Sequence, residues 1–227
     1  MGMLSFRVNE EYAQINEVVP GLFVCGVSAL NTNNMQMNRI SVIINATTEV
    51  PNLRVLGNIP RVKLWLEDAP QAYIYPHLEL QSDQIEAVIA GGGRVLVHSV
   101  GGISRCASIC LAFLTKHRCR SLRDAYQLMA SRRPMVRPNI GFWRQLIAFE
   151  QNVKGNAGSV RLVRDENEPG KLIPDVFQQV AVLSHYQMHA QRDQNTTDKL
   201  RMRRSSGQKS KFQPVLEPVL EVVEATA

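Results

Sequence analysis

Short apolar runs alternate with longer amphipathic stretches over most of the chain. The short runs are rich in β-branched residues and end at glycine, proline or polar clusters, which is typical of strands. Strands are therefore expected at residues 21–26, 40–45, 61–66 and 95–98. The longer stretches place apolar residues at every third or fourth position, which predicts helices. These are expected at residues 28–37, 74–90, 104–117, 121–132 and 140–153, with Ser28 and Ser121 as N-caps.

The order of these elements predicts an α/β domain. Helices are expected between consecutive strands, so each helix can form the crossover that lets the next strand run parallel to the one before it. We expect a central, mainly parallel twisted sheet flanked by helices. Residues 99–104 would then follow a central strand at its carboxyl end, where open α/β sheets place their ligands.

Length and composition limit the class of protein. A chain of 227 residues with 44% hydrophobic content suits one soluble globular domain and a tail. Its four cysteines lack the spacing of metal ligands, and no apolar segment reaches the roughly 18 residues of a membrane span. With no secretory signal, we expect a reduced intracellular protein without metal or other cofactor. The expected location is the cytoplasm, with the nucleus left open.

The positive charge is concentrated near the C-terminus. The chain has a net charge of +6, and residues 192–211 alone hold 7 Lys/Arg against 2 Asp/Glu. No aromatic residues interrupt these cations, so nucleic acid is not the expected partner. The motif Pro-Val-Leu-Glu then occurs twice, at 214–217 and 218–221. This composition predicts a disordered basic tail over residues 192–227.

The candidate functional residues lie in one loop. The strand 95–98 ends at His98 and leads into Ser99, Val100, Gly101, Gly102, Ile103, Ser104 and Arg105. Backbone N–H groups of such a loop, together with the positive end of a helix that begins near Ser104, bind anions. Arg105 can add a two-pronged hydrogen bond to a phosphate group. The loop is therefore predicted to bind phosphate.

Residues 98–106 resemble the signature His-Cys-x5-Arg-Ser/Thr of the cysteine-dependent protein tyrosine phosphatase superfamily. The likeness is to the small atypical members of its dual-specificity branch, because His98, Gly102 and Arg105 match. Residues 133–143 and 173–175 resemble further stretches of that branch. The resemblance implies a phosphatase-like domain at 15–177, an N-terminal extension at 1–14 and a helical extension at 178–191. It also implies phosphorylated proteins as partners, with mitogen-activated protein kinases or their regulators among the candidates.

Two positions depart from the family signature. Ser99 stands where the family has its nucleophilic cysteine, and Cys106 stands where it has serine or threonine. An alcohol ionises many pH units above a thiol, so a field that produces a thiolate leaves Ser99 protonated. Cys106 is expected to be a small core residue.

The resemblance assigns roles to the other residues of the site. Asp68, 31 positions before Ser99, takes the place of the family's general acid. The loop from Val100 to Ser104 and Arg105 would bind the phosphate, while His98 and Asn139 would support the loop.

Three functions remain open at this point. The first is a pseudophosphatase that binds phosphotyrosine, phosphoserine or phosphothreonine and regulates signalling without efficient hydrolysis. The second is an active dual-specificity phosphatase, through residual activity, through Cys106, or because Ser99 is a trapping substitution of an active parent. The third is a structural role in which the tail binds partners and the loop is vestigial. The sequence leaves the natural partner and the oligomeric state open.

Overall fold

The computed structural model describes residues 14–166 and 168–178, which form an α/β fold. A five-stranded sheet has the order β1-β2-β5-β3-β4. Its strands are β1 (Asn16–Val19), β2 (Leu22–Cys25), β3 (Val42–Asn45), β4 (Arg61–Lys63) and β5 (Val95–His98). β2, β5, β3 and β4 are parallel, whereas β1 pairs antiparallel with β2. The predicted fold class, a mainly parallel sheet flanked by helices, is confirmed.

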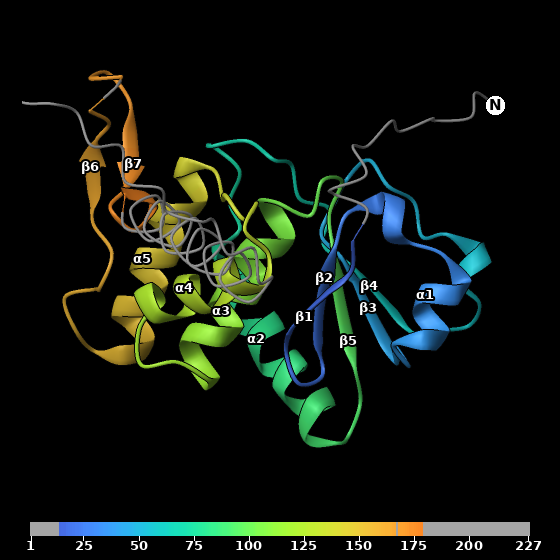
Figure 1. Ribbon diagram of the computed structural model, residues 1–227. Helices are drawn as coiled ribbons and strands as arrows, with labels where there is room; N and C mark the ends of the chain where they lie inside the picture. The colour runs from blue at the N-terminus through green and yellow to red at the C-terminus, as the bar shows by residue number, and fades with distance from the viewer. Residues whose placement is uncertain (1–13, 167, 179–227) are drawn as a thin grey trace, which may run out of the picture. The chain divides into compact units, whose positions relative to one another are not determined.

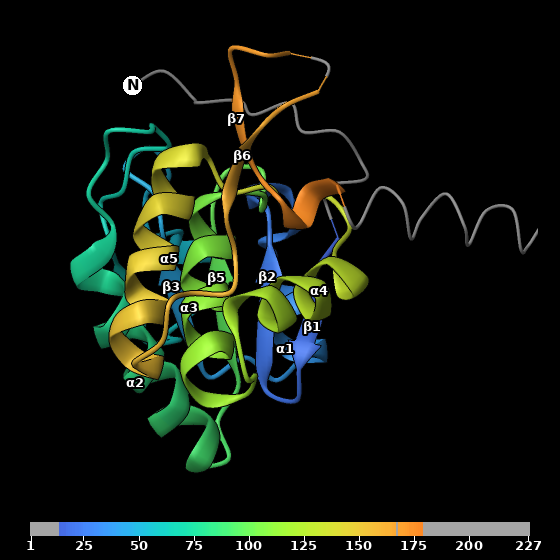
Figure 2. The same cartoon turned by 90° about the vertical axis from the view of Figure 1, so that its left-hand side faces the viewer.

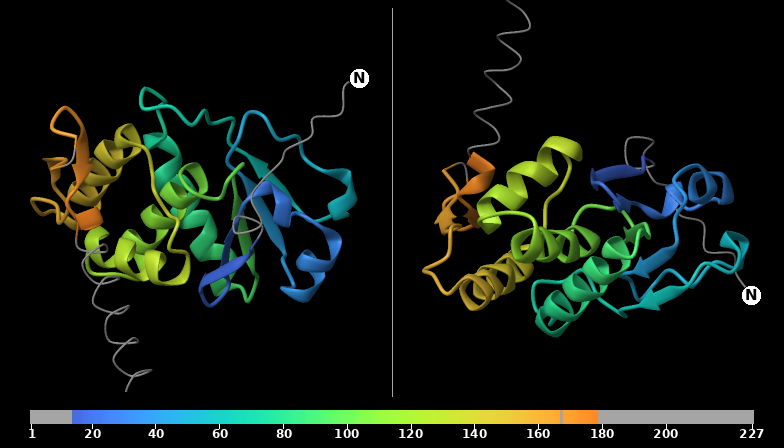
Figure 3. Two further views of the ribbon diagram at one scale, coloured as in Figure 1. Left: turned by 45° about the horizontal axis from the view of Figure 1, so that its top comes forward. Right: turned by 90° about the horizontal axis from the view of Figure 1, so that it is seen from below.

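Helices lie on both faces of the sheet (Figures 1 and 3). They are α1 (Thr32–Met37), α2 (Tyr75–Ala90), α3 (Arg105–His117), α4 (Leu122–Arg132) and α5 (Ile140–Lys154). The short α1 covers one face, and α2 to α5 form the layer on the other, which Figure 2 shows in front of the sheet. Within this layer α3 packs against α2, α4 and α5.

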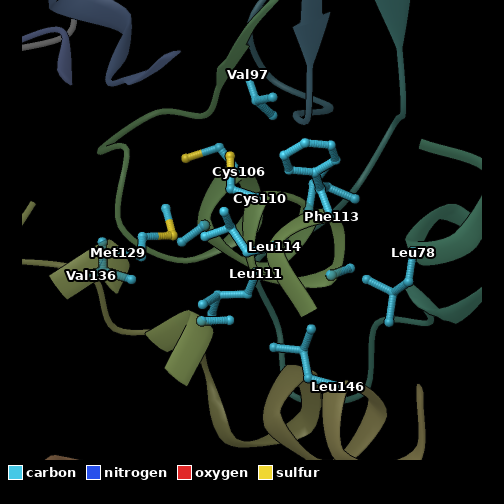
Figure 4. Close-up of a cluster of buried hydrophobic side chains, with 14 of the residues drawn as sticks. Leu78, Val97, Cys106, Cys110, Leu111, Phe113, Leu114, Met129, Val136 and Leu146 are labelled. Atoms are coloured by element: carbon cyan, nitrogen blue, oxygen red, sulfur yellow. The ribbon is translucent and has the colours of Figure 1, made fainter. Parts of the chain in front are cut away.

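The alternation of side chains along β5 divides the core into two clusters. Val95 and Val97 pack with α2 to α5, while Leu96 packs with the cluster around α1. A central strand buries both faces in this way because successive side chains point to opposite sides. Figure 4 shows Val97 close to Cys106 and Cys110 in the larger cluster. All residues of α3 from Arg105 to Thr115 are buried, so the strand before the loop and the helix after it are rigidly packed.

Most of the expected elements form, but two boundaries were wrong. The helix expected at 28–37 is a 3-10 turn at Val27–Ala29 followed by α1, because Asn31, not Ser28, caps the helix by accepting from the Asn34 N–H. The strand expected at 61–66 ends at Lys63. Trp65 has a φ of 43°, which is incompatible with an extended strand.

Three short strands had no counterpart among the expected elements. They are β1 and the two strands of a separate hairpin, β6 (Leu162–Arg164) and β7 (Leu172–Pro174). The expected domain boundaries stay a prediction. The N-terminal extension apart from residue 14, most of the helical extension and the basic tail lie outside the described residues.

Candidate functional site

Residues 99–104 connect β5 to α3 at the carboxyl edge of the sheet. They border a cavity of about 440 Å³. The cavity is lined by Asp68, Ser99, Val100, Gly101, Ile103, Ser104, Arg105, Arg137 and Asn139. The structure therefore brings together residues that lie up to 71 positions apart in the sequence, among them Asp68, Ser99 and Asn139. The position matches the one expected for a ligand in an open α/β sheet.

Arg133 holds the backbone of this loop through hydrogen bonds to its carbonyls. Its side chain is fully buried, and its Nε and Nη2 donate to the carbonyls of Gly102 (2.7 Å) and Gly101 (3.2 Å). Gly102 has a φ of 69°, and a Cβ there would lie 2.5 Å from Arg133 Nη2 and 2.7 Å from the carbonyl carbon of Cys25. Only glycine fits this position.

The backbone carbonyls of the loop form hydrogen bonds within the described residues, whereas most of its backbone N–H groups do not. The carbonyls of Val100 and Ile103 accept from the N–H groups of Val27 and Arg137, so all four carbonyls from 100 to 103 are bonded. Among the described residues, the N–H groups of Val100, Gly101, Ile103 and Ser104 have no acceptor. Unpaired N–H groups beside a helix N-terminus form an anion-binding arrangement.

Arg105 provides the charge of the site. Its side chain is only 4% exposed, and its Nη1 donates to Glu49 Oε2 (2.6 Å) and to the Leu66 carbonyl (3.1 Å). Among the described residues its buried Nε has no hydrogen-bond partner, because Asp68 Oδ2 lies 3.6 Å away. Desolvation opposes ionisation of Glu49, but hydrogen bonds and the charge of Arg105 outweigh it and lower the Glu49 pKa. Glu49 thus holds one edge of the guanidinium, and Nε faces Asp68 at ion-pair distance.

Asp68 is held at the opposite wall of the cavity. Its Oδ1 accepts from Ser104 Oγ (2.7 Å) and Asn139 Nδ2 (3.0 Å). Asn139 is also the N-cap of α5, since its Oδ1 accepts from the Phe142 N–H. The start of α5 therefore positions both the loop and the carboxylate.

Ser99 and Cys106 face each other below the cavity. Ser99 Oγ donates to Cys106 Sγ (3.1 Å) and accepts from the Gly102 N–H (3.2 Å). Cys106 is fully buried and does not line the cavity, and burial raises the pKa of its thiol despite the Ser99 hydrogen bond. Of these two residues, Ser99 lines the cavity and Cys106 does not.

His98 is a neutral, buried residue at the end of β5. Burial and the positive charge of Lys63 lower its pKa to about 4. Within the described part of the chain its Nδ1 has no hydrogen-bond partner, and no hydrogen bond links its ring to Ser99 Oγ. His98 is therefore not placed to deprotonate Ser99.

Three residues of the site were not predicted from the sequence. They are Glu49, Arg133 and Arg137, which contact or line the loop. Glu49 follows β3, whose carboxyl end lies beside that of β5, so the order of the strands could have indicated it. The two arginines lie in the stretch 133–143 that resembles the phosphatase branch.

In residues 14–166 and 168–178 no cluster of three or more His, Cys, Asp or Glu side chains could hold a metal ion. No helix in the same ranges is both long and apolar enough to cross a membrane.

Comparisons with known proteins agree on one family. The family model described as the dual specificity phosphatase catalytic domain matches residues 22–152. Dual specificity protein phosphatase 14 of Mus musculus is 39% identical over 168 residues, covering 72% of this chain and 81% of that protein. Dual specificity protein phosphatase 21 of Homo sapiens is 38% identical over 164 residues, covering 72% and 84%.

Two solved structures are also similar. Human DUSP28 has a TM-score of 0.59 and 30% identity, covering 62% of this chain and 95% of that chain. The human tyrosine phosphatase-like serine/threonine/tyrosine-interacting protein has a TM-score of 0.56 and 28% identity, covering 61% and 96%.

Proposed function

The chain belongs to the dual-specificity phosphatase family, and from that premise we propose that it is a pseudophosphatase. It binds phosphorylated tyrosine, serine or threonine side chains and does not hydrolyse them efficiently. The observation that carries the proposal is the pairing of a set of unbonded N–H donors with a hydroxyl at residue 99. Within the described residues, the N–H groups of Val100, Gly101, Ile103 and Ser104 and the Nε of Arg105 have no acceptor, while Ser99 lines the same cavity.

The donors match a phosphate monoester in number and charge. A phosphate dianion presents three acceptor oxygens, and hydrogen bonds to ionised groups are about twice as strong as neutral ones. The guanidinium of Arg105 is almost fully buried, so solvent screens its attraction for phosphate only weakly. A neutral Ser99 also avoids the like-charge repulsion that a thiolate would exert on the ligand.

Hydrolysis in this family proceeds through a thiolate, which Ser99 cannot supply. Its hydroxyl has no carboxylate or imidazole within hydrogen-bond distance among the described residues, so no general base activates it. The sulfur of Cys106 is shielded below Ser99 and its raised pKa keeps it protonated. An active enzyme, the alternative, would need a nucleophile that neither side chain provides.

The partners we propose are phosphorylated signalling proteins, with mitogen-activated protein kinases or their regulators as candidates, in the cytoplasm and the nucleus. By occupying a phosphorylated side chain, the protein would shield it from active phosphatases. One of the similar structures is itself described as a phosphatase-like interacting protein.

Calorimetric titration with matched peptides tests the binding proposal. We expect a phosphotyrosine peptide to bind at least about tenfold more tightly than its unphosphorylated form, a difference of about 1.4 kcal/mol. The Arg105→Lys variant keeps the charge but loses the planar fork, and it should lose most of this preference. Arg120→Gln is the control, because Arg120 is exposed beyond the far end of α3. Equal binding of both peptides by the native protein would refute the proposal.

A further inference from the structure

An exposed tryptophan lies three residues before Asp68. Trp65 is 70% exposed, although its neighbours Leu64 and Leu66 are buried. In the part of the chain that the structure describes, the exposed Phe, Tyr or Trp side chains are Trp65 and Tyr73, and both lie between β4 and α2. Isolated exposed apolar residues are common on protein surfaces, so exposure alone does not indicate a function. The backbone conformation of Trp65 and its position supply the further evidence.

The backbone at Trp65 is strained. Its φ of 43° lies in the left-handed region, which a bulky side chain rarely adopts. Such conformations persist where the surroundings impose them, and they occur often at ligand-binding segments. Here hydrogen bonds on both sides impose it, since the Leu64 N–H donates to the Asn45 carbonyl (2.9 Å) and the Leu66 carbonyl accepts from Arg105 Nη1 (3.1 Å). Glycine would adopt this conformation without strain, so the fold does not require a large side chain here.

The indole ring is oriented by Lys63. The Lys63 Nζ lies 4.6 Å from the centre of the ring and donates to the carbonyls of Thr48 and Val50, in the loop after β3. One face of the ring therefore lies against a fixed ammonium group, while most of the side chain stays accessible. A second cation on the opposite face would be repelled by this ammonium, so the accessible face suits a neutral apolar side chain.

The ring is within reach of a ligand in the cavity. Trp65 lies three residues from Asp68, which lines the cavity. Three residues of chain span at most about 11 Å. An extended peptide covers the same distance with about three residues of its own. A partner whose phosphorylated side chain enters the cavity can thus place its third residue on Trp65.

We infer that Trp65 binds an apolar side chain, such as Leu, Ile, Met or Phe, about three residues from the phosphorylated residue of the partner. This inference rests on the proposed function, which supplies the phosphorylated residue. Tryptophan is one of the residue types that contribute most to binding at protein interfaces. Trp65 would therefore select among phosphoproteins by a neighbouring apolar residue, with Lys63 as its positioning residue.

Calorimetry with matched phosphotyrosine peptides tests the inference. The peptides carry leucine, glutamine or arginine at the third position, in one set before the phosphotyrosine and in a second set after it. In one of the two sets we expect leucine to bind about fivefold more tightly than glutamine, as for about 40 Å² of apolar surface removed from water. Arginine should bind less tightly than leucine, and the reverse order would overturn the apolar class of ligand.

Tryptophan fluorescence reports the contact directly. The chain has two tryptophans, and Trp143 is fully buried, so a change in emission on peptide binding reports on Trp65. The leucine peptide should shift the emission to shorter wavelength, because the ring leaves water, and the glutamine peptide at equal occupancy should shift it less. An unchanged emission with bound leucine peptide would contradict the contact.

Three variants separate a binding role from a structural one. Trp65→Gly should remove the leucine preference while the Tm stays within about 3 °C of the native value, because glycine relieves the strain. Trp65→Phe keeps an aromatic face and should retain most of the preference. Met37→Ser is the control, since it removes a 75% exposed apolar side chain from α1, outside the cavity, and should leave every ratio unchanged.

The outcomes distinguish this inference from the proposed function. If leucine and glutamine bind equally in both sets, or if Trp65→Gly keeps the preference, the inference is wrong and the proposed function stands. Loss of the fold in Trp65→Gly would also overturn the inference, because the ring would then be needed for structure. If no phosphopeptide binds, both are overturned.

Discussion

The hydroxyl of Ser99 and the thiol of Cys106 lie 3.1 Å apart, yet only Ser99 reaches the cavity. Burial raises the pKa of the Cys106 thiol, so the sulfur is both shielded and protonated. If the loop binds phosphate as proposed, reactivity toward that phosphate depends on which of these two positions carries the sulfur. The neighbouring His98 does not act as a base toward Ser99, because among the described residues no hydrogen bond links its ring to Ser99 Oγ.

The state of His98 can be measured by titration. Its pKa of about 4 in the folded protein lies below the ordinary 6.5, so the unfolded chain takes up this proton first. Stability should therefore fall as the pH is lowered from about 6.5 to 4 and then level off, by about 3 kcal/mol at about 1.4 kcal/mol per pKa unit.

Nuclear magnetic resonance should show a neutral His98 ring at pH 5. Denaturant unfolding of a His98→Asn variant should lack this part of the pH dependence. Protonation of the folded protein's His98 with a midpoint above pH 6 would contradict the account.

At the scale of elements, two helix N-termini converge on the cavity. α3 begins at Arg105 directly after the loop, and α5 begins after its cap Asn139. A Cβ on Gly141, in the first turn of α5, would lie 1.8 Å from the Pro70 carbonyl oxygen, so this helix touches the backbone beside Asp68. The loop that carries Asp68 is thus fixed by contact with a helix as well as by hydrogen bonds.

A double-mutant cycle measures how strongly α5 holds Asp68. Removing Asn139 with Asn139→Ala loses a helix cap, worth about 1 kcal/mol of stability, and also the hydrogen bond to Asp68. Combined with Asp68→Ala, the coupling free energy should be about 0.5–1 kcal/mol. Ser121→Ala removes the N-cap of α4, where Ser121 Oγ accepts from the Asp124 N–H at the opposite end of that helix from Arg133, and its coupling to Asp68→Ala should be near zero. Equal couplings in both cycles would show that Asn139 does not hold Asp68.

The sequence predicted elements best where local pattern and packing agree. Val95–His98 and the helices from α2 to α5 form within one residue of the expected bounds, because their apolar periodicity matches their burial. The helix expected from Ser28 was wrong because Asn31 competes as a cap. The hairpin of β6 and β7 has only three residues in each strand, too few for a clear alternation.

The site was predictable only in part, for a physical reason. The loop proposed to bind phosphate is contiguous, so its residues could be identified together from the sequence. The contacts of Arg105 with Glu49 and of Arg133 with Gly102 join positions 56 and 31 residues apart. Their existence depends on the strand order and on helix packing, which periodicity alone does not determine.

Across the whole described domain, segments that lie far apart in the sequence meet at the site. Asp68 before α2, the loop after β5 and Arg137 before α5 all line the same cavity, and Glu49 after β3 is paired with Arg105 of that lining. A ligand that bonds to several of these segments binds the folded state and not the unfolded chain. Phosphate binding is therefore expected to stabilise the entire domain.

Thermal unfolding in the presence of inorganic phosphate tests this expectation. At about 100 times its Kd, phosphate should add about 2.7 kcal/mol and raise the Tm by about 5 °C or more. Sulfate at the same ionic strength and the Arg105→Lys variant separate site binding from a general salt effect. An equal rise in Tm for Arg105→Lys would argue against phosphate binding at this loop.

The most direct test of the account is turnover of p-nitrophenyl phosphate by the native protein and by Ser99→Cys/Cys106→Ser. We predict no turnover by the native protein above an Arg105→Lys control, and clear turnover by the exchanged variant. Adding Asp68→Asn should slow that variant about a hundredfold, as expected for loss of a general acid. Native turnover that Arg105→Lys abolishes would contradict the central claim, because the protein would then hydrolyse the phosphate that it is proposed only to bind.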